Sequence, residues 1–293
     1  MKKKTILSGL LLGTLTTTAS TLAAVNVFTK HYLYRSEIIK DDLSDLGAST
    51  IKIKNHKGLI QCGYLLEKAG ATHTLLMLHE LGKDASSLKP YVPYFEAMMP
   101  SANILLVDAS AHGMSDGYIR GFGYHDVFDL MYWNKYLLQR FGDDHKIVLY
   151  GREMGANTCL NAAGLDKLKN VQAIISDSAY DDVLSYLTRL CFKEVKVAPY
   201  ISGPMMRLIF KNEINLDPKD MDSVSYVKNN MIPTIYIHSK EDAKVPFKCI
   251  FPLYNKNKGE CVLFPIKEDH LYEMNSEDPY SKTLEIFLNQ NIR

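Results

Sequence analysis

The sequence lacks three features that would point directly to a class of function. It has no excess of either charge: 34 Lys and Arg residues stand against 33 Asp and Glu residues, so there is no electrostatic reason to expect nucleic acid as a partner. Its five cysteines are widely spaced without a CxxC pair, which indicates neither a disulfide framework nor a zinc site. It also has no internal repeat and no low-complexity tract. We therefore expect a globular protein that meets a small-molecule substrate or ligand and needs no cofactor or metal.

Length and composition predict a large hydrophobic core. The chain has 293 residues, of which 46% are hydrophobic and 10% aromatic, enough apolar side chains to bury a substantial core. We expect one large domain rather than two small ones. The cysteines, including Cys159, are expected to be small buried apolar residues.

Residues 1–30 have the composition of a signal sequence or a membrane anchor. Three lysines at positions 2–4 precede an uncharged stretch that extends to Lys30, and about 20 apolar residues span a bilayer as a helix. With the lysines kept inside, this pattern predicts a single-pass protein of the cell membrane with an extracellular domain. Two alternatives stay open: secretion after cleavage near Ala23, and a buried N-terminal helix of a cytoplasmic protein. The unpaired cysteines fit export poorly, because oxidising compartments favour disulfides.

The rest of the chain alternates between strands and helices. Residues 50–54 and 59–66 read as a hairpin with one wet face. Six continuous apolar runs are typical of strands buried on both faces: residues 74–78, 103–107, 146–150, 172–176, 234–238 and 260–264. Helix-length segments separate them, the clearest at residues 126–140. This order predicts an α/β fold with a doubly wound, mostly parallel sheet.

Residues 181–231 interrupt this alternation. About fifty residues lie here between two predicted strands, where ordinary connections are far shorter. Prolines at positions 199, 204 and 218 are expected to break the segment into short helices. We interpret it as a helical cap inserted over the carboxyl edge of the sheet, within a domain that covers residues 48–290.

Residues 151–155, with the sequence GREMG, are the most informative stretch. They fall between a predicted strand and a predicted helix at residues 156–165, so they form a sharp strand-to-helix turn. Gly151 and Gly155 suit such a turn, because a side chain there would collide with the strand or the helix. The frame is that of a nucleophile elbow, yet Glu153 stands where a serine is expected.

Two further residues follow in the order that acyl-transfer chemistry uses in doubly wound hydrolases, with the nucleophile first, then an acid, then a histidine. Asp242 lies in the loop that leaves one predicted strand, and His270 lies in the loop that leaves the next. We expect Glu153, Asp242 and His270 to lie together. An ion pair between Glu153 and His270 would raise the pKa of the histidine and hold the loops in place.

On these segments the chain resembles the α/β-hydrolase superfamily. The likeness is specifically to membrane-anchored hydrolases of Gram-positive bacteria that are similar to prolyl-oligopeptidase and acyl-esterase relatives, and it covers roughly residues 48–290. Residues 78–82 resemble the His-Gly oxyanion segment, and residues 107–117 resemble the loop with the pattern DxRxHGxSxG. The pattern at Asp242 resembles the acid loop of the family. The resemblance implies a pocket formed by His79, Glu80, Leu81 and Met154.

The sequence departs from this family at three positions. Glu153 replaces the serine, Glu80 replaces the glycine of the His-Gly pair, and Ser110 replaces an arginine. A carboxylate is a poor nucleophile toward esters and amides, and a misplacement of ~1 Å costs ~100-fold in rate. An anion at position 80 would also oppose an oxyanion. These changes weigh against ordinary serine hydrolysis.

Three functional hypotheses follow. The first is a pseudoenzyme that keeps the pocket for a ligand or a partner but lacks serine-dependent turnover. The second is a working hydrolase of small esters, amides or related substrates, in which Glu153 acts as nucleophile or as base and His270 assists. The third is a divalent cation held by Glu80, Glu153, His270 and His79, although no ligand spacing supports it.

Overall fold

The structure is a computed structural model that describes residues 19–35, 43–267 and 279–292. These residues form two compact units. The smaller comprises the N-terminal part up to Leu33 and the segment Asp182–Met221; the larger comprises Tyr34–Asp181 and the chain from Asp222 onward. All described candidate site residues belong to the larger unit. His270 lies outside the described residues.

The larger unit is built on an eight-stranded sheet in the order β1-β2-β4-β3-β5-β6-β7-β8. Strand β2 is antiparallel to both of its neighbours, and the other pairings are parallel. The strand bounds are β1 (Ser49–Lys54), β2 (Ile60–Leu66), β3 (His73–Leu78), β4 (Ala102–Val107), β5 (Lys146–Arg152), β6 (Val171–Asp177), β7 (Thr234–Ser239) and β8 (Cys261–Ile266). The predicted mostly parallel α/β sheet is confirmed.

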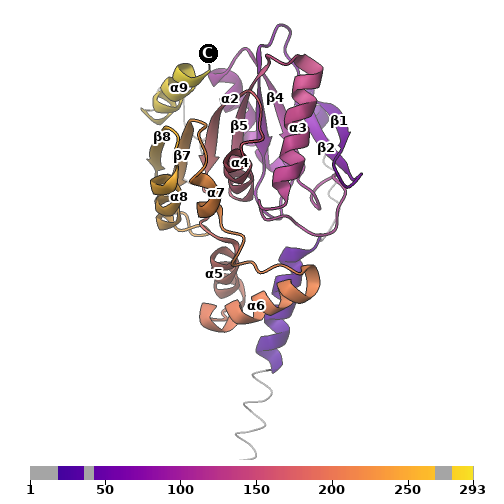
Figure 1. Ribbon diagram of the computed structural model, residues 1–293, viewed down its shortest axis with the longest axis vertical. Coiled ribbons are helices and arrows are strands. Elements are labelled where there is room, and N and C mark those ends of the chain that lie inside the picture. Colours follow the sequence, from indigo (N-terminus) through magenta and orange to yellow (C-terminus); the bar gives the residue numbers. More distant parts are fainter. Residues whose placement is uncertain (1–18, 36–42, 268–278, 293) are drawn as a thin grey trace, which may run out of the picture. The chain divides into compact units, whose positions relative to one another are not determined.

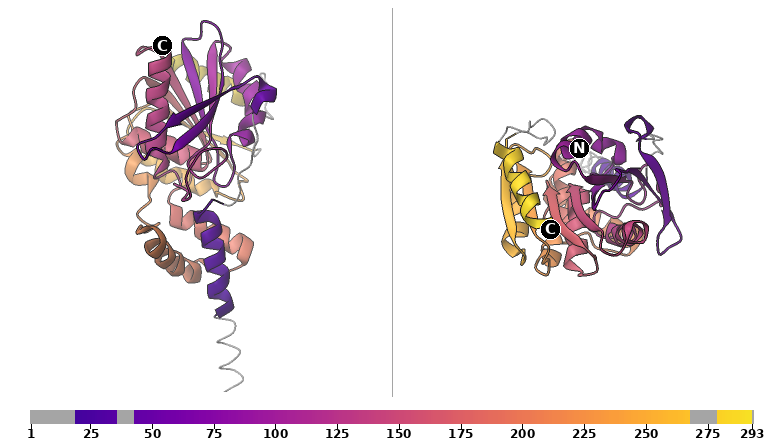
Figure 2. Two further views of the ribbon diagram at one scale, coloured as in Figure 1. Left: turned by 90° about the vertical axis from the view of Figure 1, so that its right-hand side faces the viewer. Right: turned by 90° about the horizontal axis from the view of Figure 1, so that it is seen from above.

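Helices lie on both sides of this sheet (Figures 1 and 2). Two separate clusters of buried apolar side chains, one on each face, hold the layers together. The elements on one face are η1 (Leu43–Leu46), η2 (Ala85–Tyr91), α2 (Val92–Met98) and α9 (Pro279–Asn291). Those on the other are α3 (Asp126–Phe141), α4 (Met154–Gly164), α7 (Ser223–Val227), η3 (Phe247–Cys249) and α8 (Ile250–Lys256). Burial on both faces explains why the central strands read as unbroken apolar runs.

The predicted hairpin is also present. Strands β1 and β2 pair antiparallel from Ser49 opposite Leu65 to Lys54 opposite Ile60. The side chains of β1 alternate between exposed and half-buried, as an edge strand with one wet face should. The hairpin therefore closes one edge of the sheet, far in strand order from the β7 and β8 loops that were predicted to carry the acid and the histidine.

The smaller unit consists of helices. Residues 19–33 are helical, and α5 (Val183–Val195) packs against α6 (Pro199–Ile214). The Tyr32 hydroxyl donates to the Glu194 carboxylate at 2.6 Å, and Lys30 Nζ lies 2.7 Å from Glu213 Oε1. These two contacts tie the N-terminal helix to both α5 and α6.

The prediction that Pro204 breaks the segment is wrong. Pro199 opens α6, as proline at a first helical position often does, but Pro204 lies inside it. Proline at position 204 removes the N–H that would pair with the carbonyl of Tyr200. Tyr200 is 81% exposed, so water can serve that carbonyl and the helix continues.

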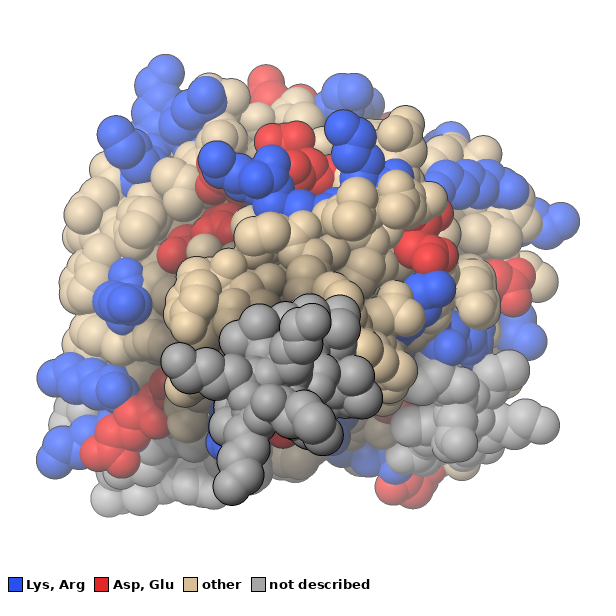
Figure 3. Space-filling model, turned by 90° about the horizontal axis from the view of Figure 1, so that it is seen from below, with Lys and Arg blue, Asp and Glu red and all other residues tan. Residues whose placement is uncertain are grey.

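No helix among the described residues has the length and apolar character that a membrane span requires. The lysines at positions 2–4 and the first part of the predicted anchor, residues 1–18, lie outside the described residues. Charges of both signs occur on the surface, and the face drawn in Figure 3 shows Lys and Arg side chains interspersed with Asp and Glu side chains. That distribution accords with the balanced composition of the chain.

Candidate functional site

The predicted elbow is present at residue 153. Strand β5 ends at Arg152 and α4 begins at Met154, so Glu153 alone makes the turn, with φ 50° and ψ −109°. An L-residue held in such a conformation carries strain of about 1–3 kcal/mol, and the surrounding structure must enforce it.

Two close backbone approaches enforce this turn. A Cβ on Gly151 would lie 2.3 Å from the carbonyl carbon and oxygen of Gly155, and a Cβ on Gly155 would lie 2.2 Å from the carbonyl oxygen of Leu78. Real Cβ atoms do not approach backbone so closely, so neither glycine can be replaced without moving the strand or the helix. The steric reason predicted for the two glycines is confirmed.

The side chain of Glu153 is buried and ion-paired. Glu153 is 5% exposed, and its Oε2 lies 2.7 Å from Nζ of Lys244. The Glu153 backbone N–H donates to the carbonyl oxygen of Asp177 at 2.8 Å. The elbow therefore presents a carboxylate that is already neutralised by an ammonium group, a partner that the sequence did not lead us to expect.

Asp242 shapes the loop that supplies this lysine. Its Oδ1 accepts hydrogen bonds from the backbone N–H groups of Lys244 at 2.7 Å and Val245 at 2.8 Å, a local turn typical of aspartate. Its Oδ2 lies 3.8 Å from Nε2 of His238, which is too long for a hydrogen bond. Asp242 thus positions the backbone of the residue that reaches Glu153.

The predicted contacts of His270 fall outside the described residues. The pairing of His270 with Glu153, and its support by Asp242, stay predictions. The imidazole of His238 has a structural role, because it is buried and its Nε2 donates to the carbonyl oxygen of Val245 at 2.7 Å.

The segment after β3 contributes a second ion pair. Oε2 of Glu80 lies 3.5 Å from Nε of Arg152, the residue that precedes the elbow glutamate. The Arg152 guanidinium also donates to the Tyr91 hydroxyl and lies over the Tyr91 ring at 5.5 Å. The carboxylate of Glu80 is therefore directed to a cation. Leu81, which was also predicted to line the pocket, is buried.

His79 is locked by its own hydrogen bonds. Its Nε2 accepts from the backbone N–H of Ala109 at 3.0 Å, so the network assigns the ring proton to Nδ1, which donates to the carbonyl oxygen of Glu80 at 2.7 Å. With both ring nitrogens engaged and the side chain buried, His79 holds two loops together and has no nitrogen left for a ligand.

Arg152 is a basic residue of the site on which four nearby carboxylates act. Burial alone would lower the pKa of its guanidinium, but nearby carboxylates outweigh burial and raise the pKa above its ordinary value. These carboxylates belong to Asp177, Glu80, Glu153 and Asp242. The site thus gathers four acidic side chains around Arg152, and Lys244 supplies a second cation.

Asp177, at the end of β6, is a site residue that the sequence reasoning missed. Its carboxylate is buried and accepts hydrogen bonds from the Tyr150 hydroxyl at 2.8 Å and the Ser178 hydroxyl at 3.0 Å. Burial raises the pKa of Asp177, although Arg152 opposes the shift. Its place opposite Arg152 in the register of β5 and β6 could have been anticipated from the strand ends.

The loop after β4 is held by polar anchors. Asp108 is buried and accepts from the backbone N–H groups of Ala85 and Met114, each at 2.8 Å. Gly113 passes so close that a Cβ there would lie 2.3 Å from the Asp108 carboxyl carbon. His112 bridges the Ser110 carbonyl and the Gly82 N–H, and burial lowers the pKa of His112 well below its usual range. His112 therefore anchors this loop.

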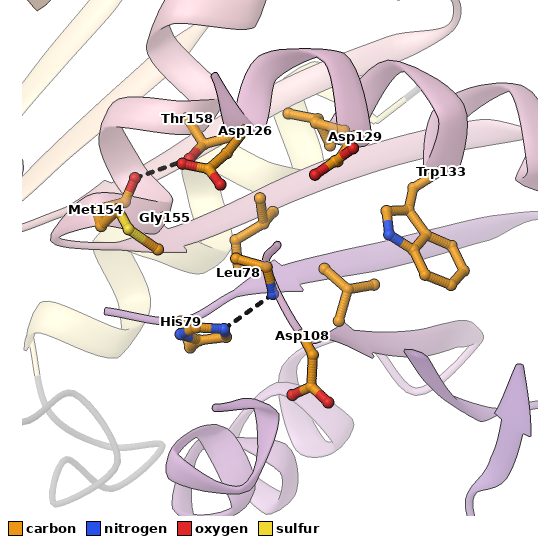
Figure 4. A pocket seen from close by; sticks show the side chains of 12 residues that line it. Leu78, His79, Asp108, Asp126, Asp129, Trp133, Met154, Gly155 and Thr158 are labelled. Carbon is orange, nitrogen blue, oxygen red and sulfur yellow. Dashed lines mark hydrogen bonds between the residues drawn. The ribbon is translucent and has the colours of Figure 1, made fainter. Parts of the chain in front are cut away.

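A small cavity lies behind the elbow, between α3, α4 and the ends of β3 and β4. Its volume is about 20 Å³, enough for one water molecule but far too small for an organic substrate. Figure 4 shows Asp126 and Asp129 on one side of it, Met154 and Thr158 beside Asp126, and His79 on the opposite side. The predicted pocket residues Met154 and His79 line this cavity.

Two carboxylates that border this cavity are held by hydrogen-bond donors. Asp126 accepts from the Gly123 N–H at 2.7 Å through Oδ2, and its buried Oδ1 has no hydrogen-bond partner among the described residues. Burial and the neighbouring Asp129 raise the pKa of Asp126 to about 7. Asp129 accepts from the Ser110 hydroxyl at 2.5 Å and from Asn55 at 2.8 Å. Ser110, which replaces the arginine of the resembled loop, thus holds a buried aspartate.

Within the described residues, no group of three or more His, Cys, Asp or Glu side chains is arranged to hold a metal ion. The hypothetical cation site drew on Glu80 and Glu153, with His79 as an optional ligand. Glu80 lies beside Arg152, Glu153 lies beside Lys244, and both ring nitrogens of His79 bond to backbone groups. Its fourth member, His270, lies outside the described residues.

Comparison with known proteins places these features in a wider context. No protein-family model matches the chain. The uncharacterized protein YqkD of Bacillus subtilis (strain 168) is 24% identical over 232 residues, which cover 77% of this chain and 74% of YqkD. The Pyrococcus furiosus esterase Pf2001 has a similar structure with a TM-score of 0.69, 18% identity, and coverage of 89% of this chain and 99% of the esterase.

The α/β hydrolase GrgF from Penicillium sp. sh18 is similar as well. It superposes with a TM-score of 0.65 and 17% identity, covering 84% of this chain and 99% of GrgF. Identities this low carry the architecture and not the activity. The strand order, the strained turn at Glu153 and these likenesses together establish that the chain has the α/β-hydrolase fold.

Proposed function

We propose that this protein is a pseudoenzyme of the α/β-hydrolase fold that binds a small-molecule ligand or a partner at the elbow without serine-dependent turnover. The observation that carries the proposal is the ion pair between Glu153 and Lys244 at 2.7 Å. A serine becomes nucleophilic when a base removes its proton, whereas this carboxylate has no proton to give and is stabilised by a neighbouring ammonium group.

The second unusual acid supports the same proposal. Glu80 and Glu153 both introduce negative charge where an acyl-transfer enzyme needs donors for an oxyanion. Each of them has a basic partner, Arg152 at 3.5 Å and Lys244 at 2.7 Å. The charges introduced by the two replacements are thus balanced locally, which favours a stable binding surface over a reacting centre.

The direct test restores the missing hydroxyl. The purified protein and the variants Glu153→Ser, Glu153→Ser with Lys244→Met, and Glu153→Gln are incubated with p-nitrophenyl acyl esters and a fluorophosphonate probe. We expect no turnover and no labelling in the wild type or in Glu153→Gln. Labelling gained only by the serine variants would support the proposal, because it would show that only the nucleophile is missing.

The alternative is a working hydrolase in which Glu153 is the nucleophile or the base. The position of Glu153 at the tip of a strained turn favours it, and Lys244 is 35% exposed, so the ion pair can open toward a ligand. Under this alternative the wild type hydrolyses small esters or amides, and both Glu153→Gln and His270→Ala abolish the rate. Such a result would overturn the pseudoenzyme proposal.

A further inference from the structure

Exposed apolar side chains gather in the smaller unit. Thirteen large hydrophobic residues are exposed among those that the structure describes, and six of them belong to this unit although it is much the smaller. They are Leu22, Val27, Phe192, Tyr200, Ile201 and Leu208. Singly exposed apolar residues need no explanation, but such a concentration on one small helical unit does.

Helix α6 carries three of these six residues, Tyr200, Ile201 and Leu208. Its inner face buries Met206 and Phe210. On the outer face, Tyr200, Pro204 and Leu208 follow each other at intervals of four residues and are all exposed, with Tyr200 81% and Leu208 61% exposed. A helix that is apolar on both faces is expected to be covered on both.

Two basic residues of α6 border this row. Arg207 and Lys211 are exposed on the same side of the helix. Arg207 is paired with Asp217, with its Nη2 2.6 Å from Asp217 Oδ2. Lys211 has no acidic side chain within ion-pairing distance among the described residues. A tyrosine and a leucine flanked by basic residues are typical of helices that lie in the headgroup region of a bilayer.

The N-terminal helix indicates what covers this face. Residues 19–33 share a compact unit with α6 and contact it through Lys30 and Glu213 at 2.7 Å. The chain that precedes this helix consists of three lysines followed by an uncharged stretch, the composition of a segment that enters a membrane. If residues 1–18 insert into a bilayer, the compact unit that contains α6 is held at the surface of that bilayer.

We infer that the outer face of α6, formed by Tyr200, Ile201, Pro204 and Leu208, docks on the surface of a lipid bilayer next to the N-terminal segment. The inference is independent of the proposed function of the elbow, because it rests on other residues. Insertion of the apolar row removes it from water, while Lys211 stays at the level of the headgroups.

A tryptophan scan tests this docking. The chain has one tryptophan, Trp133, which is 1% exposed, so a second tryptophan reports its own surroundings over a constant background. The full chain with Leu208→Trp or Tyr200→Trp is reconstituted with vesicles of phosphatidylcholine and phosphatidylglycerol, and emission is compared with that in vesicles of brominated phosphatidylcholine. Ile286→Trp in α9, where Ile286 is 57% exposed, serves as the matched control.

We expect a blue shift of the new tryptophan at positions 200 and 208, and loss of most of its emission in brominated vesicles. The tryptophan at position 286 should keep the emission of a water-exposed residue in both vesicles. Water-like, unquenched emission at positions 200 and 208 would overturn the inference. So would a blue shift without vesicles that grows with protein concentration, because that result would assign the face to a second copy of the chain.

Discussion

The larger unit contains two groups of carboxylates that the fold stabilises in different ways. Glu80 and Glu153, at the elbow, each lie beside a cation. Asp108, Asp126 and Asp129, behind the elbow, are buried and are held by N–H and O–H donors instead. The first group is partly open to solvent through its basic partners, and the second is enclosed between α3 and the loops.

The two groups therefore differ in what their carboxylates do: those at the elbow belong to the candidate site, and those behind it hold the surrounding loops and helix in place. At the edge of the sheet, Glu80 and Glu153 lie 3.5 Å from Arg152 and 2.7 Å from Lys244. The protonated form is favoured in the second group, since burial raises the pKa of Asp108, Asp126 and Asp129 alike. The contribution of these three aspartates to the stability of the fold therefore decreases as the pH rises.

The largest expected effect is that of Asp126→Asn. With a pKa of about 7 in the fold and an ordinary value when unfolded, wild-type Asp126 holds its proton more tightly in the native state, so its contribution to stability falls as the pH rises from about 4 to about 7. Asparagine cannot ionise. At pH 8 the variant should be more stable, by as much as about 4 kcal/mol, and at pH 4 the difference should nearly vanish. Urea unfolding at several pH values measures this, and a gain that does not change with pH would contradict it.

Gly113→Ala should disrupt the anchor at Asp108. The new Cβ would lie 2.3 Å from the Asp108 carboxyl carbon, at a residue whose φ is +46°. We expect a loss of about 3 kcal/mol in the free energy of unfolding, from steric overlap and backbone strain together. The matched control is Gly82→Ala, where φ is +77° but nothing lies within 4 Å. Its loss should be about 1 kcal/mol, and equal losses at the two positions would show that overlap with Asp108 plays no part.

Lys244→Met should expose the cost of an unpaired elbow carboxylate. We expect a loss of about 1–2 kcal/mol in the free energy of unfolding, because the buried Glu153 carboxylate loses a cation while Lys244 itself is partly solvated. Combining Lys244→Met with Glu153→Gln should recover most of this loss in a double-mutant cycle. Lys240→Met, at an exposed position of the same loop, should be nearly neutral. Additive effects of the two site changes would rule out the pairing.

Glu80→Gln should have the smallest effect. The Glu80–Arg152 distance of 3.5 Å is long, and Arg152 keeps its contact with Tyr91. We expect a change of about 0.5 kcal/mol that decreases at high salt. Thermal unfolding at two salt concentrations measures it. A loss as large as that of Lys244→Met would mean that Glu80, rather than Glu153, is the critical acid of the site.

The sheet and the elbow could be predicted because their causes are local in the sequence. Continuous apolar runs mark strands buried on both faces, and the spacing of Gly151 and Gly155 marks a turn that leaves no room for a Cβ. The same reasoning failed at Gly203–Pro204, where a proline lies within α6. Its lost hydrogen bond falls on an exposed side of the helix, which a residue pattern alone does not show.

The partners of the site residues could not be predicted, because they depend on loop conformation. Three lysines, at positions 240, 244 and 248, lie in or near the loop after β7, and only the turn made by Asp242 determines that Lys244 reaches Glu153. Asp242 was expected to lie beside Glu153 and His270, and one oxygen of its carboxylate binds the backbone of its own loop. The predicted association of His270 with this group lies outside the described residues.

The buried cysteines allow local opening of the native protein to be measured by thiol labelling. Cys159 lies in the first turns of α4, directly behind the elbow, is fully buried, and has a thiol whose pKa is raised by burial. Because the thiolate is the reactive species, a thiol reagent labels this position only when α4 separates from the sheet. The rate of labelling at Cys159 therefore measures how often α4, the helix that follows the elbow, separates from the sheet. No engineered probe is needed.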